Sequence, residues 1–289
     1  MIIDSHAHYA HVRYDSEFPY LNTENVKFII DRATRSELFN KMLENNIVGF
    51  IEPSISYDNI EKQLSLVREH SSHMWAAVGV HPTRCIHTDW TKRKKLYDLA
   101  VKGKAIAIGE TGLDYHHSRK EQRRFRQKRW FKYQIKLAHK LDLPLVLHIR
   151  SAEDDAIRIL KKHKNISHGG VVHCFTGDCK LAEKYLNLGL SIGIGGMLLS
   201  DNEQGKILRE TVKYLPLSSI LVETDAPYVL PDLSELNFGS NQRKKLCNSS
   251  MILKEIIRKI AELKCENTET VEKTIYKNTV KLFKLDIKE

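Results

Sequence analysis

Residues 143–150 read Leu-Pro-Leu-Val-Leu-His-Ile-Arg, a short apolar run that ends in polar residues. This run stands between two longer amphipathic stretches, at 119–142 and 152–164, and the pattern indicates a buried strand between two helices. The same alternation occurs eight times along the chain. Repeated strand and helix units predict a parallel sheet covered by helices, and eight such units predict an α/β fold of the (β/α)8 barrel type. A doubly wound open sheet is the alternative.

The predicted elements have the following bounds. Strands are expected at 2–6, 47–55, 75–81, 105–111, 143–149, 170–174, 190–196 and 219–225. Helices are expected at 34–46, 58–71, 91–102, 119–142, 152–164, 178–188, 203–214, 248–264 and 268–284. Thr34, followed three residues later by Glu37, is typical of a capping box at the start of the first helix, and Asp58 is expected to cap the second.

The chain is expected to form a single domain over residues 1–289. Barrels of about 200 to 250 residues commonly form one domain, and no repeat, low-complexity tract or Pro/Ser-rich linker divides this sequence. Two segments, 9–33 and 228–247, lack clear periodicity. Loops of that length in a compact domain are usually functional or mobile.

Composition restricts the class of protein. Hydrophobic residues make up 42% of the chain and charged residues 28%, as in globular proteins that form a core. No window has the length of apolar sequence that a membrane span needs, and no signal-peptide core follows Met1, so a cytoplasmic protein is expected. The five cysteines include no C-x-x-C pair and are expected to be reduced. The formal net charge of +10 favours polyanions such as nucleic acid.

The residues at the strand ends carry the chemical signal. In barrel enzymes the active site lies at the carboxyl ends of the strands, and six of the eight predicted strands end in a potential metal ligand or a polar neighbour. These are His6 and His8, His81, Glu110, His148, His173 and Asp225. Side-chain alternation along each strand places apolar residues below these positions on the same inward face.

Four imidazoles and two carboxylates can hold two divalent ions if one carboxylate bridges them. Nitrogen and oxygen ligands suit zinc, manganese or iron, whereas a larger share of carboxylate and water suits magnesium. Two ions about 3.5 to 4 Å apart would activate a water and stabilise a displacement at phosphorus. Buried histidines that serve only the core are the alternative for any one residue, but not for the whole set.

At this point the motifs resemble a known family. In order, they are His6-Ala7-His8, Val80-His81-Pro82, Ile108-Gly109-Glu110-Thr111-Gly112-Leu113-Asp114, His148-Ile149-Arg150, His173-Cys174-Phe175-Thr176-Gly177 and Glu223-Thr224-Asp225-Ala226-Pro227. This series resembles the signatures of the TatD family of metal-dependent deoxyribonucleases over essentially the whole chain. Asn278 and the pair Leu282-Phe283 match the closing motif of that family.

The resemblance implies an amidohydrolase-like TIM barrel that hydrolyses DNA phosphodiesters, with 3′ to 5′ exonuclease action on single strands. It implies two divalent ions, Zn²⁺, Mg²⁺ or Mn²⁺. His6, His8, Glu110 and Asp225 would hold one ion, and Glu110, His148 and His173 the other, with Glu110 as the bridge. Asp225 is also the candidate general base for the attacking water. The expected partner is single-stranded DNA, and the protein is expected to be a monomer without an obligate protein partner or membrane.

Other residues near the ligands are given supporting roles. His81 and Arg150 are expected to contact phosphate, since arginine matches phosphate geometry with paired donors; an ion pair of Arg150 with Glu153 or Asp154 is the alternative. Strand parity puts Asp4 and Glu223 one layer below His6 and Asp225. They are expected to orient ligands by accepting imidazole N–H bonds, with a buried salt bridge as the alternative.

The chain departs from the family pattern in one loop. Asn248-Ser249-Ser250 stands where the family usually has Asn-Glu-Pro, and the basic run Gln242-Arg243-Lys244-Lys245 replaces the usual Arg-Gly. Because this loop borders the expected site, the departure bears on substrate preference.

Two further features of the sequence could contact nucleic acid. Tyr9, Tyr14, Phe18 and Tyr20 could stack on unpaired bases or cap the barrel mouth. Seven basic residues lie between 119 and 129, and Phe125, Phe131, Ile135, Ala138 and Leu141 are expected to form the apolar face of their helix. The charges would then be solvated, with Arg119 and Arg123 as possible contacts to a nucleic-acid backbone.

Two other functions remain open from the sequence. One keeps the metal site but cleaves an ester or amide, as in the deacylation of a D-aminoacyl-tRNA. The other is a nucleic-acid-binding protein that has lost catalysis. Free nucleotides as products would distinguish the deoxyribonuclease from both.

Overall fold

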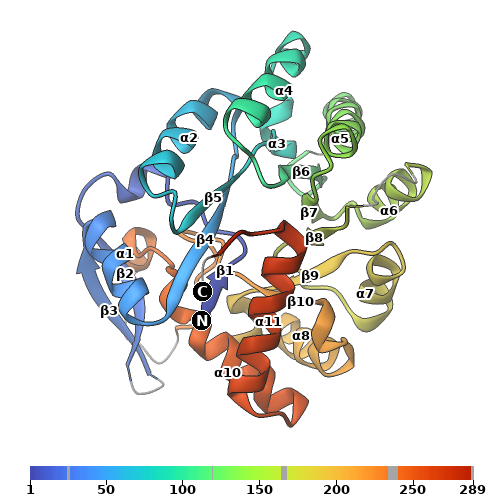
Figure 1. Ribbon diagram of the computed structural model, residues 1–289. Helices are drawn as coiled ribbons and strands as arrows, with labels where there is room; N and C mark the ends of the chain where they lie inside the picture. Colours follow the sequence, from blue (N-terminus) through green and yellow to red (C-terminus); the bar gives the residue numbers. More distant parts are fainter. Residues whose placement is uncertain (25–26, 119, 164–167, 234–239, 288–289) are drawn as a thin grey trace. The chain divides into compact units, whose positions relative to one another are not determined.

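The computed structural model describes residues 1–24, 27–118, 120–163, 168–233 and 240–287, and within them short strands alternate with helices (Figure 1). The strands of the predicted series are β1 (Ile2–Asp4), β4 (Ile47–Pro53), β5 (Met74–Ala77), β6 (Ile108–Asp114), β7 (Leu145–Arg150), β8 (Gly170–Val172), β9 (Ser191–Ile194) and β10 (Ile220–Val222). Each lies within or overlaps its predicted range.

The helices follow the predicted series as closely. They are α1 (Arg35–Glu44), α2 (Ile60–Glu69), α4 (Arg93–Lys102), α5 (Glu121–Leu141), α6 (Glu153–Lys162), α7 (Cys179–Leu186), α8 (Glu203–Tyr214), α10 (Leu253–Lys264) and α11 (Thr268–Phe283). Two short helices, α3 (Pro82–Cys85) and α9 (Ser240–Lys245), lie in connecting segments. Single 3-10 turns occur at Val12–Tyr14, Tyr57–Asn59, Trp90–Lys92, Gly196–Leu199, Leu217–Ser219 and Ser250–Ile252.

The strands pair in the order that a (β/α)8 fold requires. One sheet has the order β1-β4-β5 and the other β10-β9-β8-β7-β6. A parallel bridge joins Ala77, the last residue of β5, to Ala107 just before β6, and another joins Ala7, which follows β1, to Ala226, which follows β10. Neighbours in the sheet are therefore neighbours in the sequence of strands, as in an α/β barrel. In Figure 1, helices α4, α5 and α6 lie on the outer side of β5, β6 and β7.

The register of β6 against β7 depends on one glycine. Gly112 is paired with His148 and has a φ of +141°, in the region that favours glycine. A Cβ at this position would collide with the His148 carbonyl oxygen. The close approach of the two backbones sets Glu110 and Asp114 of β6 beside His148 of β7.

By their contacts, the residues group into two compact units. The first comprises Met1–Ile51, Cys174–Ala182 and Gly193–Asn278, and the second comprises Glu52–His173, Glu183–Ile192 and Thr279–Glu289. Each unit draws on segments that are distant in sequence. A single domain over residues 1–289 stays a prediction.

The segment 9–33 is not the unstructured loop expected from the sequence. Its second half forms an antiparallel hairpin of β2 (Phe18–Glu24) and β3 (Lys27–Ala33), and Tyr20 is paired with Asp31. Asp31 accepts hydrogen bonds from the Tyr20 hydroxyl and from Lys41 of α1. The expected capping box of Thr34 and Glu37 then begins α1.

The aromatic side chains of this segment are buried, which makes their predicted role in base stacking wrong. Tyr9, Tyr14, Phe18 and Tyr20 are at most 3% exposed. Tyr9 and Tyr14 pack with ring centroids 5.0 Å apart, and Tyr14 packs on Phe18 at 4.7 Å. These rings form an apolar core of the first unit and present no face to a nucleobase.

The expected cap of α2 is also wrong. Asp58 lies one residue too early, because the N-cap of α2 is Asn59, which makes no side-chain capping bond. The Asp58 carboxylate instead pairs with Lys92 at 2.8 Å.

The buried face of helix α5 contains two polar side chains that the apolar pattern did not predict. Gln127 and Gln134 are at most 1% exposed and stand beside Phe131 and Ile135. Gln127 accepts from the Asp114 backbone N–H and donates to the Asp114 carbonyl, while Gln134 makes the same two bonds to Val80. Two side chains, two turns apart on one helix, thus fix the residues next to His81 and at the end of β6.

Phe125 does not belong to this buried face, contrary to the prediction. Its side chain is 66% exposed. Six residues separate it from Phe131, and at about 100° per residue the two point to different sides of a helix. The polar glutamines, which the apolar pattern excluded, complete the buried face in its place.

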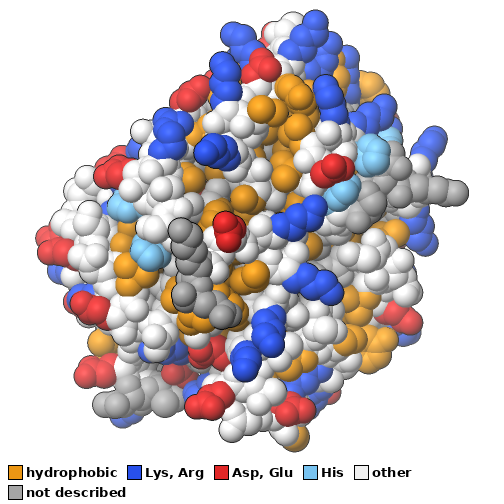
Figure 2. Space-filling view, viewed as in Figure 1, with side chains coloured by type: hydrophobic (Ala, Val, Ile, Leu, Met, Phe, Trp, Pro, Cys, Tyr) orange, Lys and Arg blue, Asp and Glu red, His pale blue; other side chains and the backbone are white. Residues whose placement is uncertain are grey.

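The basic residues of α5 divide into two sets. Arg124 donates to the Ser118 carbonyl and lies over the Tyr115 ring, and Lys128 pairs with Asp155. Arg123, Arg126 and Arg129 are exposed and form no ion pair with any residue that the structure describes. Arg119 lies outside the described residues. Figure 2 shows Lys and Arg side chains gathered over α4 and α5.

The second predicted loop, 228–247, contains the short helix α9. Residues 234–239 of this loop lie outside the described residues. Among the helices that the structure describes, none has the length and apolar character to cross a membrane.

Candidate metal centre

The first unit brings together His6, His8 and Asp225. His6 and His8 follow β1, and Asp225 follows β10; its backbone N–H donates to the His6 carbonyl at 2.9 Å. The Nε2 atoms of the two histidines are 3.1 Å apart, and Asp225 Oδ1 lies 3.5 Å from His6 Nε2 and 3.2 Å from His8 Nε2. We call these residues the Asp225 group.

The spacing of this group matches ligands around one cation. For a metal–nitrogen distance of about 2.0–2.1 Å in tetrahedral geometry, ligand atoms lie roughly 3.3 Å from one another. The three ligand atoms of the Asp225 group are separated by distances close to this value, as the measurements above show. Both histidines are buried, whereas the side chain of Asp225 is 16% exposed and faces solvent.

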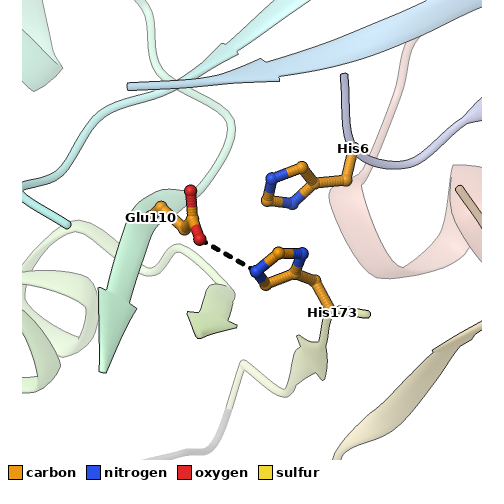
Figure 3. A group of neighbouring side chains, drawn as sticks. All are labelled: His6, Glu110 and His173. Carbon is orange, nitrogen blue, oxygen red and sulfur yellow. Dashed lines mark ion pairs between the residues drawn. The ribbon is translucent and has the colours of Figure 1, made fainter. Parts of the chain in front are cut away.

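The second unit brings together Glu110, His148 and His173, with His81 beside them. Glu110 lies on β6, His148 on β7, and His173 directly after β8. Glu110 Oε1 is 2.8 Å from His173 Nε2, 2.9 Å from His148 Nδ1 and 3.4 Å from His81 Nε2. We call these four residues the Glu110 group. Figure 3 marks the Glu110–His173 ion pair and also labels His6.

The electrostatics of the Glu110 group favour a bound cation. Burial raises the pKa of Glu110, but the charges of His81 and His173 and hydrogen bonds from His148 and His173 hold it well below its usual value. Burial lowers the pKa of His148, but its bonds to Asp114 and Glu110 raise it to about 9. The Glu110 carboxylate is therefore ionised, as a ligand to a cation has to be.

Asp114 also belongs to the site, although no role was expected for it from the sequence. Asp114 Oδ2 lies 3.2 Å from His148 Nε2, which is the ring nitrogen that faces away from Glu110. Asp114 Oδ1 accepts a hydrogen bond from the His117 backbone N–H. A carboxylate that holds the far nitrogen of a ligand histidine fixes the orientation of the ring. The sequence could have indicated this role for Asp114, because Glu110 and Asp114 are four residues apart on one strand and share a face.

The structure places Asp4 and Glu223 next to residues of the two ligand groups. Asp4 accepts from the backbone N–H groups of His6 and Thr224, and from the hydroxyls of Thr224 and Ser250. Glu223 accepts from the backbone N–H of Cys174. Both side chains hold the backbone beside a ligand. The bonds of Asp4 go to backbone N–H groups and hydroxyls rather than to imidazole, and the predicted bond from Glu223 to an imidazole stays a prediction.

Burial raises the pKa of Asp4 to about 6, although its four hydrogen bonds lower it. Ser250, which stands at the family's proline position, makes part of this network. Its hydroxyl lies 2.7 Å from Asp4 Oδ2 and 2.8 Å from the Tyr9 hydroxyl. Asn248 donates to the carbonyls of Thr224 and Val229. The atypical Asn-Ser-Ser sequence therefore supports the loop that carries Asp225.

The two predicted phosphate contacts differ in setting. His81 is buried, its Nδ1 lies 2.7 Å from the Thr83 hydroxyl, and its ring lies against His148 with centroids 4.3 Å apart. Burial lowers the pKa of His81, and the nearby Glu110 only partly offsets that effect. Arg150 is exposed and pairs with neither Glu153 nor Asp154 in the described residues. The ion-pair alternative for Arg150 is therefore wrong.

Comparisons with known proteins agree with this geometry. Residues 3–284 match the model of a family described as TatD related DNase. The chain is 36% identical over 228 residues to the 3′-5′ ssDNA/RNA exonuclease TatD of Rahnella, which covers 79% of this chain and 83% of that one. It is 29% identical to the uncharacterized metal-dependent hydrolase YabD of Bacillus subtilis, over 99% of this chain and all of the relative.

A solved structure shares the fold. The TatD homologue YjjV of Escherichia coli superposes with a TM-score of 0.81 at 25% identity, covering 99% of this chain and 98% of that one. The predicted amidohydrolase-like (β/α)8 class is confirmed.

Proposed function

The chain belongs to the TatD-related DNase family, and from this premise we propose that it is a metal-dependent nuclease that shortens single-stranded DNA from its 3′ end. The observation that supports the proposal most strongly is the ligand set of the two groups. Histidine nitrogens and carboxylate oxygens from different strand ends lie within 4.8 Å of one another in the Asp225 group, and so do those of His81, Glu110 and His148 in the Glu110 group. Relatives of the chain are named metal-dependent hydrolases and 3′-5′ exonucleases.

The donor atoms fit divalent cations, so we assign the ligands as follows. His6, His8, Glu110 and Asp225 would hold one ion, and Glu110, His148 and His173 would hold the other. Nitrogen-rich sites of this kind suit Zn²⁺ or Mn²⁺, and the carboxylates also accept Mg²⁺. When bound, the ions lower the pKa of a water and neutralise charge that develops at phosphorus.

The side chains of this protein then share the remaining work. Asp225 is the only carboxylate of the described ligands with substantial exposure, at 16%, so it can orient the attacking water and accept its proton. Water adds to phosphorus as the ester bond breaks, and the leaving oxygen takes a proton from solvent. Arg150 binds a substrate phosphate through its exposed guanidinium, and His81, held by Thr83, contacts the phosphate next to the Glu110 group.

Asp4 and Glu223 position the ligands in this proposal. Asp4 bonds to the backbone of His6 and of Thr224, the residue before Asp225, so one carboxylate fixes both ends of the Asp225 group. Glu223 fixes the backbone of Cys174, which follows His173.

The experiment is a cleavage assay on chelator-stripped protein, resupplied separately with Mg²⁺, Mn²⁺ or Zn²⁺. Single-stranded and duplex DNA are offered with the label at the 5′ end or at the 3′ end. The proposal expects a ladder of 5′-labelled products that shorten by one nucleotide, only with metal and preferentially on single strands. Immediate release of the 5′ label as a mononucleotide would show the opposite polarity. Intact DNA with every metal, together with release of the acyl group from an aminoacyl-tRNA, would establish the ester hydrolase instead.

A further inference from the structure

A groove of about 610 Å³ lies in the second unit between the first turns of α5 and the segment that follows α3. One wall consists of Ile86 and His87. The other consists of Glu121, Gln122, Arg123, Phe125, Arg126 and Arg129. None of these residues belongs to the metal-ligand groups.

The groove carries a positive charge that is not neutralised. Three arginines and one glutamate give a formal charge of 3 − 1 = +2. Arg126 donates to the Ile86 carbonyl at 2.6 Å, and the Arg129 guanidinium lies 4.0 Å from the centroid of the Trp90 ring. Backbone and ring contacts therefore hold two guanidiniums in place without cancelling their charge, as a site for phosphates requires.

An exposed aromatic ring stands among these charges. Phe125 is 66% exposed, and nothing in its helix pattern requires a phenyl ring on that side. A flat apolar ring flanked by guanidiniums is the combination on which single-stranded nucleic acids bind, since the ring stacks on a base and the cations hold the adjoining phosphates.

The groove begins close to the Glu110 group along the chain. Helix α3 starts directly after His81, and Ile86 follows its last residue, Cys85. Helix α5 begins seven residues after Asp114, which holds His148. Both walls thus continue from strand ends that carry site residues of the same unit.

We propose that this groove binds the part of a single strand that lies on the 5′ side of the bond to be cleaved. An unpaired base stacks on Phe125, and Arg123, Arg126 and Arg129 bind the neighbouring phosphates. This inference rests on the proposed function for its substrate class, but binding in the groove needs no metal.

The first test measures binding to metal-stripped protein. A fluorescently labelled single strand of about 16 nucleotides is titrated by anisotropy, and Phe125→Ala is compared with the unaltered protein. The proposal expects a loss of affinity of about tenfold for the single strand and less than twofold for the matching duplex, because paired bases cannot stack on the ring. Tyr214→Ala, which removes a 52% exposed ring from α8, is the control and should change neither value. An unchanged affinity of Phe125→Ala for the single strand would overturn the proposal.

The second test separates phosphate contacts from general charge. Arg123→Gln is expected to lower the slope of log affinity against log salt concentration by about one for single strands. Arg68→Gln removes an exposed arginine of α2 that lies outside the groove and is the matched control. Equal changes in the two variants would mean that only the net charge matters and would contradict the groove assignment.

Activity gives an independent readout. For the metal-loaded enzyme, Phe125→Ala should raise KM for the single strand about tenfold and leave cleavage of a small chromogenic phosphodiester unchanged. Equal losses on both substrates would place Phe125 in the site itself and overturn the inference. If the proposed nuclease function is wrong, a different result is expected. The unaltered protein would then bind single strands in the groove but would cleave neither substrate.

Discussion

At the scale of single residues, Asp114 shows how the site depends on a group that binds no metal in our assignment. Its carboxylate is 1% exposed and lies between His148 and His117. Burial raises its pKa, but bonds from His148 and His117 outweigh that effect and keep it ionised. It therefore holds His148 with the other ring nitrogen turned toward Glu110.

Asp114→Asn is expected to weaken metal binding about tenfold, since replacing the charged partner of a ligand histidine typically costs 10 to 100-fold in affinity. Isothermal titration of stripped protein with Mn²⁺ or Zn²⁺ measures this directly. Asp98→Asn, an exposed change on α4, serves as the control and should leave the affinity unchanged. Equal affinities of Asp114→Asn and the unaltered protein would remove Asp114 from the site.

The ligand groups could be predicted from the sequence because the carboxyl ends of parallel strands lie at the same edge of the sheet, whatever the lengths of the connections. What could not be predicted was the direction of each side chain within the groups. His81 lies close enough to Glu110 to contact it, and Asp4 bonds to backbone rather than to imidazole. These details depend on local backbone geometry, which residue spacing does not determine.

At the scale of elements, α5 does more than cover the sheet. Its side chains Gln127 and Gln134 form hydrogen bonds with the backbone of Asp114 and Val80. Both glutamines are buried, and each provides a hydrogen-bond partner for one backbone N–H and one backbone C=O where water has no access.

Gln127→Leu is expected to lower the free energy of unfolding by about 2 to 4 kcal/mol, because it leaves a buried N–H and C=O of Asp114 without partners. Urea denaturation followed by circular dichroism provides the measurement. Lys132→Leu introduces the same side chain at an exposed position of α5 and should change stability by less than about 0.5 kcal/mol. A Gln127→Leu protein as stable as this control would show that the two bonds contribute nothing.

The hairpin β2–β3 is the element that the sequence did not reveal. Only Ala33 is buried along β3, so the strand has no alternating apolar pattern, and Pro19 interrupts β2. The hairpin is held instead by long-range contacts, such as those from Leu21 to Cys247 and Ser249. Periodicity reports burial along one segment and cannot detect a strand that depends on such contacts.

At the scale of the whole molecule, metal binding and folding stability are linked. Both ligand groups join residues that are distant in sequence, so an unfolded chain cannot present them to an ion. A ligand that binds only the folded state at one hundred times its Kd stabilises it by about 2.7 kcal/mol.

Stripped protein is therefore expected to gain about 4 °C in Tm for each ion bound at that excess, and about 9 °C for two, when Mn²⁺ or Zn²⁺ is restored. Differential scanning calorimetry with and without metal gives the shift. Glu110→Gln should lose most of it, because the change removes the proposed bridging charge. A metal-independent Tm in the unaltered protein would contradict the proposed centre.

The most direct test of the central claim counts the ions that one chain binds. Stripped protein is dialysed against Mn²⁺ or Zn²⁺, and bound metal per chain is measured by mass spectrometry of the elements. Two equivalents are expected for the unaltered protein, about one for Asp225→Asn, and fewer than one for Glu110→Gln. No bound metal in the unaltered protein, or the same content in Glu110→Gln, would contradict it.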